Sequence, residues 1–164
     1  MYFGPKRYEF YLERYAELYF LVGKLEFLLR VNIVATLRDF SYKYGYREWH
    51  LVIPDTPQNR TSIAKAIKTS KGLDFENFLP FSFWRHLFRR EYFAGLWVPA
   101  LHMAFLGIPN AVSKENFTIV CKKMKRANNI RNRVAHFNLI NAGDHEEEIA
   151  TLKWLINGMG VHLG

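Results

Sequence analysis

Apolar residues recur every three or four positions over the first forty residues of the chain. This spacing predicts one long amphipathic helix that begins near Gly4 and Pro5, with Gly23 as a candidate for a bend. Its apolar stripe consists of Tyr8, Tyr11, Leu12, Tyr15, Leu18, Tyr19, Val22, Leu25, Leu29, Ile33 and Leu37. The sequence therefore predicts that this helix supplies one side of the core.

The middle of the chain has a less regular pattern. Residues 41–59 contain a glycine and two prolines and are expected to form a connection, while residues 60–70 are expected to form a short basic helix with a solvated outer face. Between residues 79 and 107, the pattern predicts two aromatic-rich helices: one starts near Pro80, and the next has Pro99 in its first turn. Aromatic residues at helical spacing are usually core, so we favour a core here over a surface that stacks bases.

Two more helices are expected in the last third of the chain. Ser113 suits the start of a helix that continues into residues 127–141, and Asp144 with Glu147 forms a capping box for the last helix, after an interruption at Gly143. The inward residues are expected to be Phe117, Val120, Cys121, Met124, Ile149, Leu152, Trp154, Leu155 and Ile156. Because no long segment alternates with the period of a strand, the sequence predicts an all-α fold in a single domain, residues 1–164.

Composition limits the class of protein. The 164 residues are 49% hydrophobic, which is enough for one substantial core, and the formal charge of +8 favours an acidic partner such as RNA or an anionic membrane face. Charge alone does not decide this, because basic proteins without such a partner are equally common. With no apolar run of about 18 residues and no signal-peptide pattern at the start, we expect a cytoplasmic protein that does not enter the membrane.

Cysteine and histidine usage argues against disulfides and metal sites. The single Cys121 cannot form an internal disulfide and is expected to be a reduced core thiol. The six histidines are scattered without the spacing of zinc ligands. We therefore expect no metal and no cofactor.

The densest group of reactive side chains lies in ANNIRNRVAHFNLIN, residues 127–141. Arg131 and Arg133 can each bind a phosphate oxygen, and His136 can exchange a proton near neutral pH. On a helix, Asn132 and Arg133 lie within roughly 60° of His136, whereas Arg131 lies roughly 140° away. Ile130, Val134 and Phe137 are expected to face the core.

Two further groups of charged residues are candidates for supporting roles. Glu26 and Arg30 are four residues apart beside the apolar stripe, where we favour a partly buried ion pair over a role in orienting the site. The other group is a basic face that leads toward Arg131 and is the expected RNA-binding surface: Lys122, Lys123, Lys125 and Arg126.

The motif and its surroundings resemble the HEPN superfamily. IRNRVAH, residues 130–136, is similar to the RNxxxH signature, and the order of blocks resembles the Abi-like, abortive-infection branch. These blocks are LYFLVGKLEFLLRVNI with its Glu and Arg, LPFSFWRHLF followed by LWVPALHMAF, and a last helix with a tryptophan. Positions 137 and 138 differ from that branch, which more often has a second histidine and an acidic residue there. A tyrosine two residues after His136, typical of HEPN toxins silenced by nucleotidylation, is also missing.

The resemblance implies a homodimeric helical bundle in which two motifs face each other. It further implies a metal-independent endoribonuclease that acts in phage defence or as a toxin, with an antitoxin or defence-system partner. Arg131 and His136 would be the catalytic pair, and Asn132 and Arg133 would support them. The alternative is a non-catalytic helical module for RNA binding or dimerisation. A metabolite enzyme is less favoured, because the chain has no glycine-rich phosphate loop and no nucleophile elbow.

Overall fold

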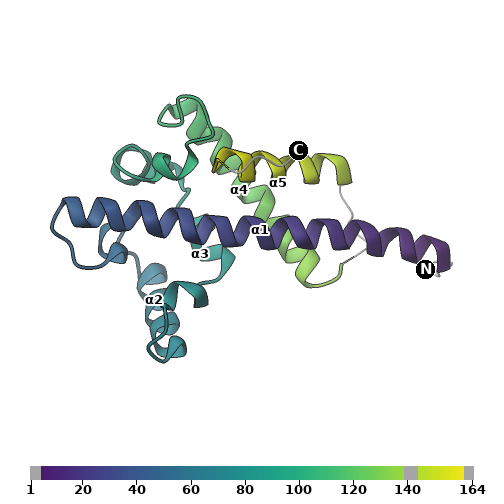
Figure 1. Cartoon of the computed structure of the whole chain (residues 1–164), viewed down its shortest axis with the longest axis horizontal. Coiled ribbons are helices and arrows are strands. Elements are labelled where there is room, and N and C mark those ends of the chain that lie inside the picture. Colours follow the sequence, from purple (N-terminus) through teal and green to yellow (C-terminus); the bar gives the residue numbers. More distant parts are fainter. Residues whose placement is uncertain (1–4, 139–143, 161–164) are drawn as a thin grey trace.

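The computed structural model describes residues 5–138 and 144–160, and every regular element in these ranges is helical (Figure 1). The α-helices are α1 (Pro5–Lys43), α2 (Pro57–Ser70), α3 (Phe81–His86), α4 (Lys114–Ala135) and α5 (His145–Gly158). The short helical turns are η1 (Trp49–Val52), η2 (Phe75–Phe78), η3 (Arg90–Tyr92), η4 (Phe93–Trp97) and η5 (Leu101–Phe105). The predicted all-α class is confirmed. None of the described helices is long and apolar enough to cross a membrane.

Helix α1 is the axis of the molecule. It runs the full length of the fold (Figure 1). Helix α5 packs along its middle, from Glu17, which contacts His145, to Asn32, which donates to the carbonyl of Met159; α4 also packs against it, and α2 and α3 lie below its C-terminal half. The helix continues unbroken through Gly23 and ends at Lys43, several residues later than the apolar stripe suggested. Leu25, Leu29 and Ile33 are completely buried because neighbouring helices cover this part of α1 on the stripe side.

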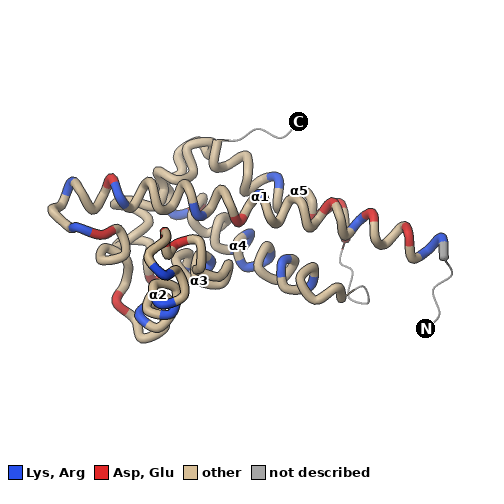
Figure 2. Tube along the Cα trace, turned by 60° about the horizontal axis from the view of Figure 1, so that its bottom comes forward, with Lys and Arg blue, Asp and Glu red and all other residues tan. Residues whose placement is uncertain are grey.

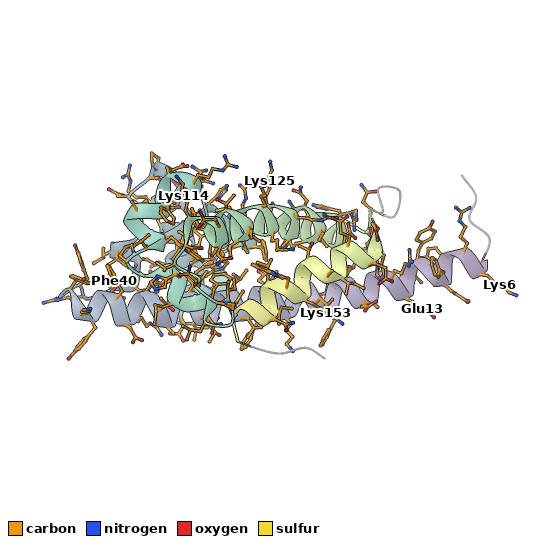
Figure 3. The ribbon with its side chains drawn as sticks, turned by 90° about the horizontal axis from the view of Figure 1, so that it is seen from above. Lys6, Glu13, Phe40, Lys114, Lys125 and Lys153 are labelled. Atoms are coloured by element: carbon orange, nitrogen blue, oxygen red, sulfur yellow. The ribbon has the colours of Figure 1, made fainter. Side chains whose placement is uncertain are left out.

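The N-terminal part of the same stripe is only partly covered. Tyr15, Leu18 and Val22 are buried. Tyr8 and Leu12 are exposed because the first turns of α1 extend beyond the rest of the molecule (Figure 3), whereas Tyr19 is exposed because it lies at the edge of the stripe. The expectation that the whole stripe is core is wrong for Tyr8, Leu12 and Tyr19. A spacing of three and four residues identifies a face, but it does not say how far the neighbouring helices reach along it.

Residues 79–107 form one short helix and a series of tight turns, where the sequence predicted two longer helices. Here α3 is six residues long, and η4 and η5 are a π-helical and a 3₁₀ turn. Proline restricts the residue before it and interrupts regular hydrogen bonding, so Pro99 ends a turn instead of starting a long helix. Leu106, expected on an inward helical face, is exposed.

The aromatic residues of this region are core, as predicted. Trp49 stacks against Trp84 with ring centroids 5.9 Å apart, and Trp97 lies 5.0 Å from Phe117 of α4. All three tryptophans are essentially buried. The packing of large rings therefore determines the path of this segment.

The end of this region makes a close backbone contact with the end of α5. The Gly107 amide donates to the Gly158 carbonyl at 2.9 Å, and a Cβ atom on Gly107 would lie 2.2 Å from the carbonyl oxygen of Asn157. No flexible side chain can move aside there, because the nearest atoms are backbone. Glycine at position 107 is thus required for α5 to dock.

Replacing Gly107 by alanine is expected to destabilise the protein by about 3 kcal/mol, at the upper end of the cost of overpacking. Gly95→Ala is the matched control, because a Cβ atom there meets nothing within 4 Å. Urea unfolding followed by circular dichroism measures both. Equal unfolding midpoints for the two variants would contradict the close contact.

The two C-terminal helices begin as their capping residues predicted. The Ser113 side chain accepts a hydrogen bond from the amide of Asn116, and Asp144 accepts one from the amide of Glu147. Helix α4 continues without a break to Ala135, so the arginine and histidine motif occupies its last turns and the residue that follows it. The expected interruption at Gly143 lies outside the described residues.

Candidate functional site

His136 lies immediately after the last residue of α4. Its amide still donates to the Asn132 carbonyl at 3.2 Å, but its ψ of 9° is no longer helical, so His136 is the residue that caps the end of α4. Phe137 then adopts a left-handed conformation with φ of 47°, which turns the chain away from the helix. This turn places the imidazole at an exposed corner of the molecule.

Phe137 was expected to face the core, and that expectation is wrong. The helix stops two residues before it, so helical spacing no longer determines its direction. Its side chain is 67% exposed and stacks on Tyr15 of α1, with ring centroids 6.1 Å apart and planes 12° from parallel. The Tyr15 hydroxyl donates to the carbonyl of Asn138 and thereby ties the turn after the helix to α1.

An exposed polar stripe leads along α4 to His136. Its members are spaced three and four residues apart and all are exposed: Lys122, Lys125, Asn129, Asn132 and His136. We call this stripe the polar ridge. Lys125 points away from the neighbouring helices (Figure 3). At the end of the ridge is an open hollow of about 390 Å³ lined by Asn129, Asn132, Arg133, His136 and Asn138.

Arg133 lines this hollow but is held by α5. Its two terminal nitrogens donate to the two carboxylate oxygens of Glu148 at 2.6 and 2.5 Å, and both side chains are largely buried. The hydrogen bond to Glu148 raises the pKa of Arg133. Arg133 therefore joins α4 to α5 directly beside His136, which suits the supporting role that the sequence suggested.

Arg131 lies on the other side of α4. At about 100° per residue, it falls roughly 20° from the buried Val120 and roughly 140° from His136. It is half-buried and does not line the hollow around His136. One chain therefore does not place Arg131 in the hollow that His136 lines.

Glu26 and Arg30 form the ion pair that the sequence favoured. The carboxylate and guanidinium are 3.8 Å apart and only about a fifth exposed, and Arg30 also donates to Asn77 at 3.4 Å. This pair lies about three turns along α1 from Tyr15, the residue bonded to the turn after His136. The structure does not bring the pair to His136.

The four basic residues predicted to bind RNA point in two directions. Lys122 and Lys125 belong to the exposed polar ridge. Lys123 instead lies over the ring of Trp154, with its ammonium 5.1 Å from the centroid, and Arg126 pairs with Glu147. This pairing raises the pKa of Arg126 and lowers that of Glu147. Figure 2 shows basic residues recurring along α4.

Two features of the structure were not apparent from the sequence. The first is an apolar hollow of about 350 Å³ beside Phe137, which includes Tyr15, Tyr19 and Val134. The second is a pair of arginines, Arg85 and Arg90, whose charges act on the Cys121 thiol of α4. Both features depend on contacts between segments that are distant in the sequence. The only sequence signal for the apolar hollow was the phenylalanine that follows the histidine.

Cys121 is expected to be unreactive in the folded protein. Burial raises the pKa of its thiol from 9.0 to about 11, although Arg90 acts in the opposite direction. A rise of two pKa units lowers the fraction of reactive thiolate about 100-fold near neutral pH. Iodoacetamide labelling at pH 8, followed by mass spectrometry, is therefore expected to be about 100-fold slower in native protein than in urea. Similar rates in both conditions would contradict a buried thiol.

The described residues hold no group of three or more His, Cys, Asp or Glu side chains placed to bind a metal ion. The side chains that line the hollow at the end of α4 are an imidazole, three amides and one guanidinium group. Comparisons of the chain with protein-family models, with curated proteins and with solved structures found no match in any of the three.

Proposed function

We propose that this chain is a metal-independent endoribonuclease of the HEPN type, which cleaves single-stranded RNA in phage defence or as a toxin. The observation that carries the proposal is the exposed imidazole of His136 at the end of the polar ridge, within a motif that resembles RNxxxH. Lys122 and Lys125 lie along the approach and can hold phosphate groups by charge. An accessible proton-transfer group beside a cationic stripe suits cleavage of a polyanion.

The proposed reaction uses the 2′-hydroxyl of RNA as an internal nucleophile, so it needs no activated water. The imidazole of His136 accepts the 2′-hydroxyl proton while the 2′-oxygen bonds to phosphorus and the bond to the 5′-oxygen breaks. A second imidazole protonates the departing 5′-oxygen. The products are a 2′,3′-cyclic phosphate and a 5′-hydroxyl.

Arg131 supplies the positive charge in this scheme. A guanidinium group stabilises the negative charge that accumulates on the phosphorane oxygens. Its side chain has no hydrogen bond or ion pair with any described residue, and its long stem allows the charged end to turn around α4. A structure with bound RNA is expected to show this reorientation.

A homodimer would supply the second imidazole. Phe20, Phe27 and Val31 form an exposed apolar stripe on α1, roughly opposite the side that faces the core. Large exposed apolar patches commonly mark protein interfaces. We propose that this stripe is where two copies meet. Sedimentation equilibrium is expected to give twice 19.4 kDa for the native chain and a monomer for Phe20→Glu with Phe27→Glu. A monomeric native protein would contradict the dimer.

One observation favours the alternative, a non-catalytic helical module for RNA binding or dimerisation. Arg131 lies outside the hollow around His136, so the catalytic pair is not assembled within one chain. The double variant Arg131→Ala with His136→Ala separates the two functions in cells and in binding assays. Loss of toxicity with RNA binding retained supports the enzyme, whereas unchanged toxicity supports the module. Co-purification of an antitoxin with the inactive variant would identify its partner.

A further inference from the structure

We propose that the apolar hollow beside Phe137 binds a nucleobase of the RNA, adjacent to the phosphate that is cleaved beside His136, with Phe137 as the stacking platform. This inference rests on the proposed function, since it assigns the part of the RNA substrate that the same site holds. The hollow is about 350 Å³ and is lined by Leu12, Tyr15, Ala16, Tyr19, Val134 and Phe137. None of these side chains is charged, and five of the six are aromatic or branched aliphatic groups that suit a flat ring.

The conformation of Phe137 does not follow from packing needs. A bulky side chain at a φ of 47° is strained, and such strain is concentrated at functional sites. The strain is not offset by burial, because two-thirds of the side chain is exposed. A glycine or asparagine would end α4 with less strain. The strained backbone has one clear result, which is that the aromatic ring of Phe137 faces the solvent.

The ring is also held in place. Tyr15 stacks against Phe137 with planes 12° from parallel, and its hydroxyl donates to the carbonyl of Asn138, the next residue. The turn after α4 is thereby fixed to α1. A stacking platform that is rigid before binding loses less entropy when a base arrives.

The location favours a nucleobase as the occupant. Phe137 follows His136 directly in the chain, so the ring that lines the apolar hollow and the imidazole that lines the polar one belong to the same turn after α4. RNA has the matching arrangement, with a charged backbone for Lys122 and Lys125 on the ridge and flat rings for the hollow. Stacking between bases and aromatic side chains tolerates any base sequence, because every base has a π-face. The site therefore predicts recognition of unpaired RNA without strong sequence preference.

The test compares RNA with an abasic oligomer of the same length and charge. Both are titrated into His136→Ala protein, which prevents cleavage, and into the same protein carrying Phe137→Ala. We expect Phe137→Ala to weaken binding of a uridine dodecamer about 5- to 150-fold, the range for loss of one stacked base. Binding of the abasic oligomer should not change. Tyr42→Ala, which removes another exposed aromatic residue of α1, is the matched control and should alter neither affinity.

A second variant separates stacking from folding. Phe137→Gly removes both the ring and the strain, so it is expected to raise the melting temperature while weakening RNA binding as much as Phe137→Ala does. Phe137→Trp should retain binding. Equal weakening of binding for RNA and for the abasic oligomer would overturn the proposal. A Phe137 variant that changes the sedimentation of the protein but still prefers RNA over the abasic oligomer as strongly as before would also overturn it. Because these assays measure binding, a protein that never cleaves RNA but shows the base dependence would refute the nuclease and retain the base site.

Discussion

Replacing His136 by alanine is expected to lower the rate of RNA cleavage by about 10² to 10⁴, the usual contribution of a group that transfers a proton in the transition state. The side chain is exposed and makes no hydrogen bond with any described residue, so its removal should leave the unfolding midpoint unchanged. Single-turnover cleavage of a labelled RNA measures the rate. Circular dichroism of the same preparations checks the fold.

His86→Ala is the control for the loss of a histidine. His86 lies at the end of α3, within 3.0 Å of the Gln58 amide, and does not line the hollow around His136. Its replacement is expected to leave cleavage close to the native rate. If the two variants lost activity equally, or if His136→Ala cleaved as fast as the native protein, His136 would not be the proton-transfer group.

The second large effect concerns the bond between α4 and α5. Arg133→Met leaves the carboxylate of Glu148, which is only 4% exposed, without its bidentate partner. Breaking a buried pair from one side typically costs about 3 to 5 kcal/mol, because the remaining charge stays buried. The midpoint of urea unfolding is therefore expected to fall markedly, and the hollow around His136 should lose one wall.

Arg126→Met is the matched control, because Arg126 also pairs with a glutamate across the contact between α4 and α5. Arg126 pairs with Glu147, which is more than half exposed, so water replaces the lost partner and the midpoint should hardly change. Arg133→Met with Glu148→Leu should recover part of the stability, since no charge is then left buried. Equal losses for Arg133→Met and Arg126→Met would show that burial of Glu148 does not determine the effect.

Local signals in the sequence predicted the parts of the fold that depend on local contacts. Ser113 and Asp144 cap α4 and α5 as expected, because a capping side chain bonds an amide only three residues away. The angular separation of Arg131 and His136 follows from helix geometry and needs no tertiary information. The continuation of α4 into the motif was predictable on the same grounds.

Contacts between distant segments account for what the sequence did not predict. Arg133 and Glu148 are fifteen residues apart and pair only because α5 folds back along α4. The outward direction of Phe137 depends on where α4 stops and on the ring of Tyr15, more than a hundred residues earlier. The short turns at residues 79–107 depend on how the tryptophans pack. None of these contacts leaves a periodic pattern in the chain.

The chemical ends of the RNA products test the central claim most directly. The purified protein is incubated with single-stranded RNA in excess EDTA, and the ends are identified by mass spectrometry. The proposed mechanism predicts 2′,3′-cyclic phosphate and 5′-hydroxyl ends, formed in EDTA by the native chain and not by His136→Ala. Cleavage that requires added metal ions, or products with 5′-phosphate ends, would contradict it.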